Sequence, residues 1–251
     1  MKIFLSESQV DYDTYTFNYT VYCKQENHGE TGEIYQKGFL PYSNSLKLKE
    51  PHYYLARSLR VNLDKFKETS ENRRLNRKFE VYNPQILLHS KEEFEKDEAF
   101  QNFCLDYAGQ RFDGKMSPER FQYVFEWPYF NKILEFRTGE GRLMGYVFAV
   151  ISGGMFHYWF SFYDLEFPQS GLGKWMMYKS IDWAKKQNFK EVYLGTCYGE
   201  KAMYKMRDFK ALEFFDGNRW NPDMKKLKQK CKTDSNKNTD DFKAELNENN
   251  I

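Results

Sequence analysis

The chain has 251 residues and a net charge of only +2, from 38 basic and 36 acidic residues. Aromatic residues make up 19% of it, which is typical of packed sheets and helices and excludes a disordered chain. This length allows one large domain, or a small domain followed by a medium one. The balanced charge neither requires nor excludes a nucleic-acid partner, so local clusters of charge have to decide.

The N-terminal stretch MKIFLSESQVDYDTYTF has neither the apolar core nor the cleavage site of a signal peptide. No apolar run approaches the length of a membrane span. The four cysteines, Cys23, Cys104, Cys197 and Cys231, lack the paired spacing of a zinc site or a disulfide framework. We therefore expect a cytoplasmic protein without a membrane partner, a bound metal or a resident cofactor.

Residues 1–85 are predicted to form a small α+β unit. Aromatic and β-branched residues alternate from Tyr12 to Val21, which indicates a strand, and a helix is expected to end at Gly38. A further strand is predicted from Tyr53 to Leu63. A helix follows, with Ser70 as its N-cap.

Residues 86–223 are predicted to form the main domain. Ser90 with Glu93, and Ser117 with Pro118, are typical helix starts. Three apolar stretches separated by glycine turns then predict an antiparallel meander: Ile133 to Phe136, Leu143 to Ile151 and Phe156 to Tyr163.

A glycine turn, a helix to about Asn188 and a short strand from Val192 to Leu194 complete a βαβ crossover. We expect one mixed sheet from about residue 90 to residue 222, with the helix that begins near Gly171 packed against it. From residue 224 the chain is polar and charged, which predicts a disordered tail over 224–251.

The glycine turn is the sequence Gln169-Ser170-Gly171-Leu172-Gly173-Lys174. Unpaired N–H groups at a helix N-terminus attract anions, and glycine lets an anion approach the backbone closely. An N-acetyltransferase (GNAT) domain holds the pyrophosphate of coenzyme A on such a turn, with Arg or Gln three residues before the first glycine. Here Gln169 lies two residues before it, and a strand-to-helix turn without a ligand is the alternative.

Two segments, SFYDLEFPQSGLGKW and VYLGTCYGEKAMYKMRDFKALEFFDGNRW, resemble the aminoacyl-tRNA protein transferases. This family includes eukaryotic arginyltransferases and bacterial aspartate/glutamate leucyltransferases. Its recurring pieces match Phe162-Tyr163-Asp164, Gly171-Leu172-Gly173, Tyr193-Leu194-Gly195, Lys201, Met203, Tyr204, Lys205, Phe209 and Glu213. A fainter match, LARSLRVNLDKFKETSENRR, contains Arg60, Arg73 and Arg74. The family's paired cysteines are absent, since Cys23 stands alone and Ala56 replaces a later one.

The resemblance implies a GNAT-like fold of the α+β or α/β class, with a mixed sheet flanked by helices. It also implies transfer of arginine or leucine from tRNA to the N-terminal α-amine of proteins that start with Asp or Glu, which tags them for degradation as N-degrons. Because the tRNA ester is already activated, neither ATP nor a metal is needed, and the aminoacyl-tRNA is itself the co-substrate. A free α-amine has a pKa of about 7.7 to 8.0, so a strong base is unnecessary.

Each part of this reaction has candidate residues. The catalytic candidates are Tyr163, Asp164, Tyr204 and Lys205. The donor-binding candidates are Gln169, Ser170, Gly171, Gly173, Lys174 and Lys201. Arg60 and Arg207 are candidates for binding the acidic acceptor, because a guanidinium suits a carboxylate. Arg73, Arg74, Arg77 and Lys78 have helical spacing and could contact tRNA phosphates.

Each candidate also has a simpler explanation. Tyr163 can be a core aromatic, Asp164 a turn former, and the basic residues an exposed helix face. An acyl-CoA-dependent GNAT N-acetyltransferase and a non-catalytic RNA- or peptide-binding relative are the two alternative functions.

Overall fold

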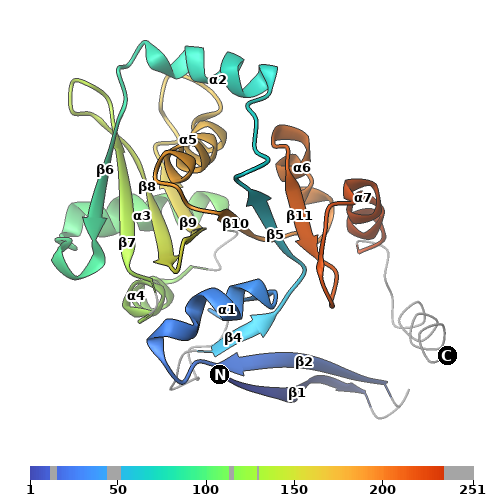
Figure 1. Ribbon diagram of the computed structural model, residues 1–251. Helices are drawn as coiled ribbons and strands as arrows, with labels where there is room; N and C mark the ends of the chain where they lie inside the picture. Colours follow the sequence, from blue (N-terminus) through green and yellow to red (C-terminus); the bar gives the residue numbers. More distant parts are fainter. Residues whose placement is uncertain (12–15, 44–51, 113–115, 129, 235–251) are drawn as a thin grey trace.

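The computed structural model describes residues 1–11, 16–43, 52–112, 116–128 and 130–234. In these residues the strands form a four-stranded sheet and an eight-stranded sheet (Figure 1). The small sheet contains, in spatial order, β1 (Lys2–Asp11), β2 (Thr16–Lys24), β4 (His52–Leu55) and β3 (Phe39–Pro41). Between β2 and β3 lie η1 (His28–Glu30) and α1 (Thr31–Gln36), and Gly38 follows with a φ of +85°, as expected for a helix end. Tyr12 and Tyr15 of the predicted alternation lie outside the described residues.

The large sheet is mixed, as the sequence predicted. Its strands in spatial order are β12 (Trp220–Asn221), β11 (Leu212–Phe215), β5 (Ser58–Asn62), β10 (Glu191–Thr196), β9 (Met155–Tyr163), β8 (Leu143–Ser152), β7 (Lys132–Arg137) and β6 (Gln85–Ser90). The neighbours β9 and β10 are parallel and the other pairs are antiparallel. The predicted meander and the crossover from β9 to β10 are therefore confirmed.

The prediction of a single strand from Tyr53 to Leu63 is wrong. The segment forms two strands, β4 and β5, which belong to different sheets. The Ser58 amide donates to the Ala56 carbonyl at 2.7 Å, and the Ser58 hydroxyl donates to the Gly38 carbonyl at 2.7 Å. No glycine or proline marks this break in the sequence, so the apolar pattern runs through it. As a result β5, which falls within the range 1–85, pairs with β10 and β11 of the large sheet.

The helix starts follow local capping, in two cases at other residues than expected. Thr69, not Ser70, caps α2 (Ser70–Glu80) by accepting the Asn72 amide at 3.0 Å. Ser90 precedes only the short η2 (Lys91–Glu93), and α3 (Glu98–Arg111) is capped by Asp97. Ser117 caps α4 (Pro118–Glu126), as predicted. The remaining helices are α5 (Leu172–Lys186), η3 (Glu200–Ala202), α6 (Tyr204–Asp208) and α7 (Met224–Thr233).

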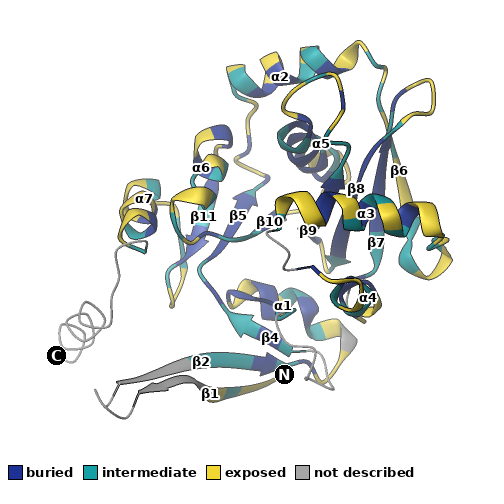
Figure 2. Ribbon diagram, turned by 180° about the vertical axis from the view of Figure 1, so that it is seen from behind, coloured by how far each residue is buried: buried dark blue, intermediate teal, exposed yellow. Residues whose placement is uncertain are grey.

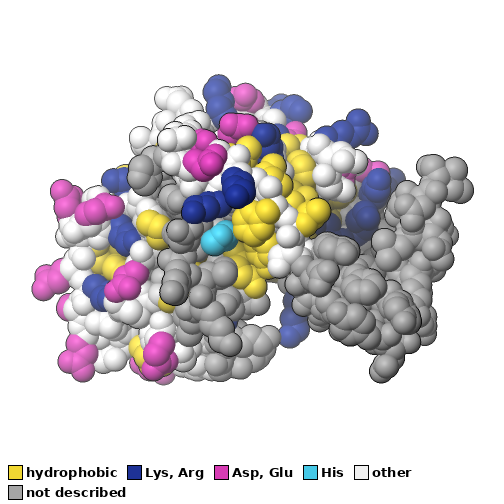
Figure 3. Space-filling view, turned by 90° about the horizontal axis from the view of Figure 1, so that it is seen from below, with side chains coloured by type: hydrophobic (Ala, Val, Ile, Leu, Met, Phe, Trp, Pro, Cys, Tyr) yellow, Lys and Arg dark blue, Asp and Glu magenta, His cyan; other side chains and the backbone are white. Residues whose placement is uncertain are grey.

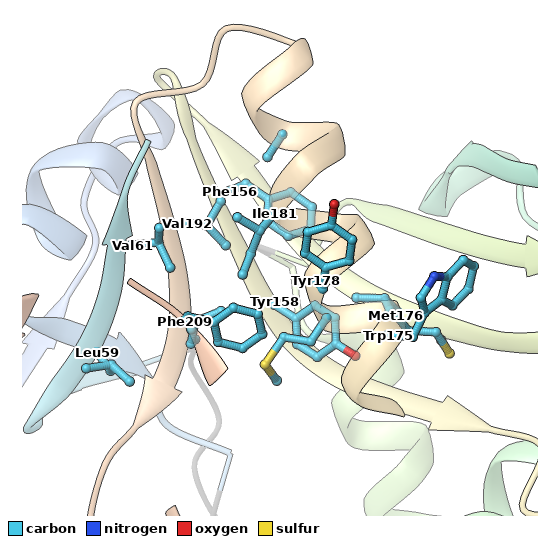
Figure 4. Packing of buried hydrophobic residues seen from close by; sticks show 14 of the residues in the cluster. Leu59, Val61, Phe156, Tyr158, Trp175, Met176, Tyr178, Ile181, Val192 and Phe209 are labelled. Carbon is cyan, nitrogen blue, oxygen red and sulfur yellow. The ribbon is translucent and has the colours of Figure 1, made fainter. Parts of the chain in front are cut away.

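The two faces of the large sheet carry separate cores because successive residues of a strand point to opposite faces. On β7, Leu134 and Phe136 pack with α2 and α5, whereas Ile133 packs with α3 and α4. Figure 2 shows the buried inner sides and exposed outer sides of these helices, and Figure 4 shows aromatic and aliphatic side chains of α5 meeting those of β9 and β10. The helix at the glycine turn therefore packs against the mixed sheet, as predicted.

Residues 224–233, which were predicted as the start of a disordered tail, form α7. Asp223 caps this helix, and Leu227 and Cys231 are fully buried against the large sheet. The two apolar residues lie four apart on one helix face, a signal too short to stand out among the lysines. Residues 235–251 of the predicted tail lie outside the described residues.

The lower surface of the molecule, below the small sheet, shows apolar side chains gathered near its middle and acidic side chains at one side (Figure 3). Among the described residues, no helix is long and apolar enough to cross a membrane.

Candidate functional site

The turn between β9 and α5 leaves the first N–H groups of α5 without a side-chain cap. Gly171 has a φ of +93° and is the N-cap residue, with no side chain to cap the first turn of α5. A Cβ on Gly173 would overlap the ring of Tyr163 at the end of β9. Both glycines are therefore required, one by its backbone conformation and the other by the close approach of an aromatic ring.

A cavity of about 490 Å³ opens at this turn. It collects most of the residues that were predicted to act together: Tyr163, Asp164, Gln169, Ser170, Gly171, Gly173, Lys174, Tyr204 and Arg207. They come from the end of β9, the turn, α5 and α6, and α3 adds Tyr107 and Arg111. We call this cavity the turn pocket.

Three tyrosines, Tyr107, Tyr163 and Tyr204, line the turn pocket. The rings of Tyr107 and Tyr163 lie 4.7 Å apart between centroids. Burial and a hydrogen bond to Tyr163 raise the pKa of Tyr107, and burial raises the pKa of Tyr204 to about 12. At neutral pH the hydroxyls of Tyr107 and Tyr204 are therefore hydrogen-bond donors rather than bases.

Asp164 is held in place by two contacts. Its carboxylate accepts a hydrogen bond from Arg142 at 2.6 Å and another from the Glu166 amide at 2.9 Å. This arrangement fits the simpler explanation of Asp164 as a turn former, with Arg142 as its ion-pair partner.

A buried carboxylate, Asp208, was missed by the sequence reasoning. It is 2% exposed and pairs with Lys174 at 3.0 Å and with Arg207 at 2.9 Å. Lys174 also contacts Glu71 on α2 at 3.3 Å. This ion-pair network holds two cations that line the turn pocket. No sequence signal distinguishes Asp208 from a surface acid at the end of a short helix.

The basic residues of α2 lie beside the turn pocket because Glu71 and Asn72 connect this helix to it. The Asn72 side chain donates to the Asp208 carbonyl at 3.1 Å. Arg73, Arg74 and Arg77 are exposed and Lys78 is half-buried. Arg74 is paired with Glu71 at 2.7 Å, so Arg73 and Arg77 are the better candidates for contacts to a polyanion.

Arg60 does not line the turn pocket. It is 8% exposed, pairs with Glu213 at 2.8 Å and lies 4.1 Å from the ring centroid of Trp220. Its guanidinium is occupied by the protein's own groups, so the prediction that Arg60 binds an acidic acceptor is not supported by its position. Lys201, on η3, is exposed and also lies outside the residues that line the turn pocket.

Lys205 does not line the turn pocket, although its neighbour Tyr204 does. The Lys205 ammonium donates to the carbonyls of Leu194 at 2.6 Å and Thr196 at 3.1 Å, both on β10. Loss of solvent lowers its pKa to about 8. It lines a second cavity of about 230 Å³, together with His157 of β9.

Among the described residues, no group of three or more His, Cys, Asp and Glu side chains is placed to hold a metal ion. The four cysteines are free thiols, all buried. The expectation that the protein needs no metal or cofactor stays a prediction.

The domain that contains the turn pocket is similar to a known protein family. The acetyltransferase (GNAT) domain family matches residues 131–206, which run from β7 through the turn pocket to α6. Together with the mixed sheet and the glycine turn, this match shows that the main domain has a GNAT-like fold.

The particular relatives are aspartate/glutamate leucyltransferases. One from Saccharophagus degradans is 28% identical over 169 residues, which are 64% of this chain and 69% of that protein. One from Stenotrophomonas maltophilia is 36% identical over 62 residues, a quarter of each chain. The resemblance to aminoacyl-tRNA protein transferases is therefore confirmed, and with it the prediction of a transferase. Among solved structures, that of L-PGS from Bacillus licheniformis has a TM-score of 0.44 and 14% identity, over 66% of this chain and 49% of that one.

Proposed function

We propose that the protein transfers leucine from leucyl-tRNA to the N-terminal α-amine of proteins that begin with Asp or Glu. The similarity to the leucyltransferase from Saccharophagus degradans, over most of both chains, carries this proposal. The name of that relative favours leucine over arginine as the donated residue. The modified proteins would become N-degrons for degradation in the cytoplasm.

The turn pocket suits the donor in its charge and in its hydrogen-bond donors. The tRNA 3′ end carries phosphates, and the N-terminus of α5 offers positive potential beside them. Lys174, Arg207 and Arg74 share the two carboxylates of Asp208 and Glu71, so this network keeps an excess of positive charge. Arg111 adds a further cation on the α3 side. The tyrosine hydroxyls can donate to the oxyanion that forms when the ester carbonyl is attacked.

In the reaction the acceptor nitrogen forms a bond to the ester carbonyl carbon. The bond from that carbon to the tRNA 3′ oxygen then breaks, and the tRNA hydroxyl leaves with the proton that the amine loses. An α-amine with a pKa of about 7.7 to 8.0 is partly neutral at neutral pH, so the protein has to supply orientation and oxyanion stabilisation more than a base. This agrees with a pocket that three tyrosines line.

A transfer assay decides between the two donors. The protein is incubated with labelled leucyl-tRNA or arginyl-tRNA and with peptides that begin with Asp, Glu or Ala. We expect label on the Asp and Glu peptides from leucyl-tRNA alone. Transfer from arginyl-tRNA alone would support aminoacyl transfer but show that arginine, not leucine, is donated. Transfer from neither tRNA would refute the proposal.

The α2 helix gives a separate prediction about tRNA binding. Replacing Arg73 and Arg77 with Ala should weaken tRNA binding and reduce the slope of log affinity against log salt by about one for each phosphate that is no longer neutralised. Replacing Arg74, which is paired with Glu71, should have a smaller effect. Filter binding at several salt concentrations measures both, and an unchanged slope in the double variant would place the tRNA elsewhere.

A further inference from the structure

The second cavity lies between β9 and β10, and its lining includes the polar side chains of His157 and Lys205. Its walls come from β3, β4, β9 and β10, with Leu40, Pro41, Tyr54, Trp159 and Phe160 among them. The strands β9 and β10 pair only from Met155 to His157, and this cavity lies where that pairing has ended. We call it the β9–β10 pocket.

The ammonium of Lys205 in this pocket has no acidic partner among the described residues. Its hydrogen bonds go to two backbone carbonyls, and no carboxylate contributes to its pKa. A lysine ammonium has three N–H donors, so one remains for a ligand. A desolvated cation without a counter-ion is unfavourable, and an anionic ligand would relieve that cost.

His157 supplies a second group without a partner. It is 1% exposed, its Nδ1 is 2.9 Å from the Tyr35 hydroxyl, and its Nε2 has no hydrogen-bond partner among the described residues. Burial and the nearby Lys205 lower its pKa to about 3, so the ring is neutral. If the Tyr35 hydroxyl donates to Nδ1, the proton lies on Nε2 and can be donated to an oxygen atom.

Tyr204 and Lys205 connect the two pockets, because these adjacent residues of α6 line the turn pocket and the β9–β10 pocket respectively. A transferase has to bring two substrates together, and two pockets that share one short helix meet this need. The volume of about 230 Å³ is below the roughly 300–1,000 Å³ of pockets for drug-sized ligands, so this pocket suits a side chain rather than a nucleotide.

We propose that the β9–β10 pocket binds the side-chain carboxylate of the acceptor's first residue, with Lys205 as its ion-pair partner and His157 as a hydrogen-bond donor. This assignment rests on the proposed function for the identity of the acceptor. It makes Lys205 the residue that distinguishes Glu from Gln at the acceptor N-terminus. A neutral amide would leave the ammonium without a counter-ion, which is the basis of the discrimination.

Binding of peptides in the absence of tRNA tests the pocket independently of transfer. Titration calorimetry compares two peptides that differ only in Glu or Gln at the first position. The wild-type protein should bind the Glu peptide at least about tenfold more tightly. The Lys205→Met variant, of similar length but uncharged, should bind both peptides alike, and a retained preference for Glu would overturn the proposal.

A second pair of variants covers the case in which Lys205→Met fails to fold. Ser43 is half-buried and lines the β9–β10 pocket. Ser43→Trp should fill the pocket and weaken binding of the Glu peptide at least about tenfold. Gly109→Ala, on α3 and outside both pockets, should leave it unchanged. Unchanged binding in Ser43→Trp would also overturn the proposal. Failure of transfer from every aminoacyl-tRNA, with the Glu preference intact, would instead refute the proposed function.

Discussion

The Gly173→Val variant should lose at least about 100-fold in aminoacyl transfer, since displacements of about 1 Å at a reacting centre are enough for such losses. The new side chain would overlap the Tyr163 ring, so either the ring or the start of α5 has to move. Both form the wall of the turn pocket. Single-turnover transfer from leucyl-tRNA to a peptide beginning with Glu measures the loss.

Gly109→Ala is the matched control for this variant. Gly109 lies on α3, and a Cβ there would meet no atom within 4 Å. Alanine is a better helix former than glycine, so this variant should be active and slightly more stable. Activity of Gly173→Val close to that of Gly109→Ala would show that the turn pocket does not hold the donor.

The Trp175→Ala variant should lower the free energy of unfolding by about 3–5 kcal/mol, as expected when a buried aromatic side chain leaves a cavity. Trp175 on α5 is fully buried, stacks on Phe79 of α2 at 4.8 Å between centroids and donates to Asn76 at 3.2 Å. The residue thus joins the two helices that flank the turn pocket. Loss of the Trp175 side chain should therefore destabilise the fold and also weaken the packing of α2 against α5.

Urea denaturation measures this effect as a shift of the midpoint at constant slope. Trp175→Phe keeps the stacking but loses the hydrogen bond, so it should cost clearly less than the alanine variant. Equal midpoints for Trp175→Ala and the wild type would mean that α2 and α5 are not joined through this side chain.

Local patterns predicted the central part of the fold because its elements are marked by local signals. Glycine turns separate the three strands of the meander, and Gly171 and Gly173 mark the start of α5. The same residues mark the turn pocket, so the donor candidates from Gln169 to Lys174 were found together, whereas Lys201 lies outside it. The order of strand, turn, helix and strand predicted the βαβ crossover, and the resemblance to the aminoacyl-tRNA protein transferases implied the GNAT-like fold.

The features that the sequence did not show depend on tertiary contacts. The break between β4 and β5 is made by hydrogen bonds from Ser58, one of which reaches the distant Gly38 carbonyl. The role of Arg60 depends on Glu213, which lies 153 positions later. Likewise, Lys205 faces a different pocket from Tyr204 because adjacent residues on a helix point in different directions. Spacing alone contains none of this information.

The most direct test of the account compares two donors for the same protein and the same acceptor. The wild-type protein is mixed with a peptide that begins with Glu and with either leucyl-tRNA or acetyl-CoA, and the peptide's mass is followed over time. We predict addition of leucine from the tRNA and no acetylation. Micromolar binding of acetyl-CoA, with acetylation of the peptide and no transfer from leucyl-tRNA or arginyl-tRNA, would contradict it and establish an acyl-CoA-dependent N-acetyltransferase.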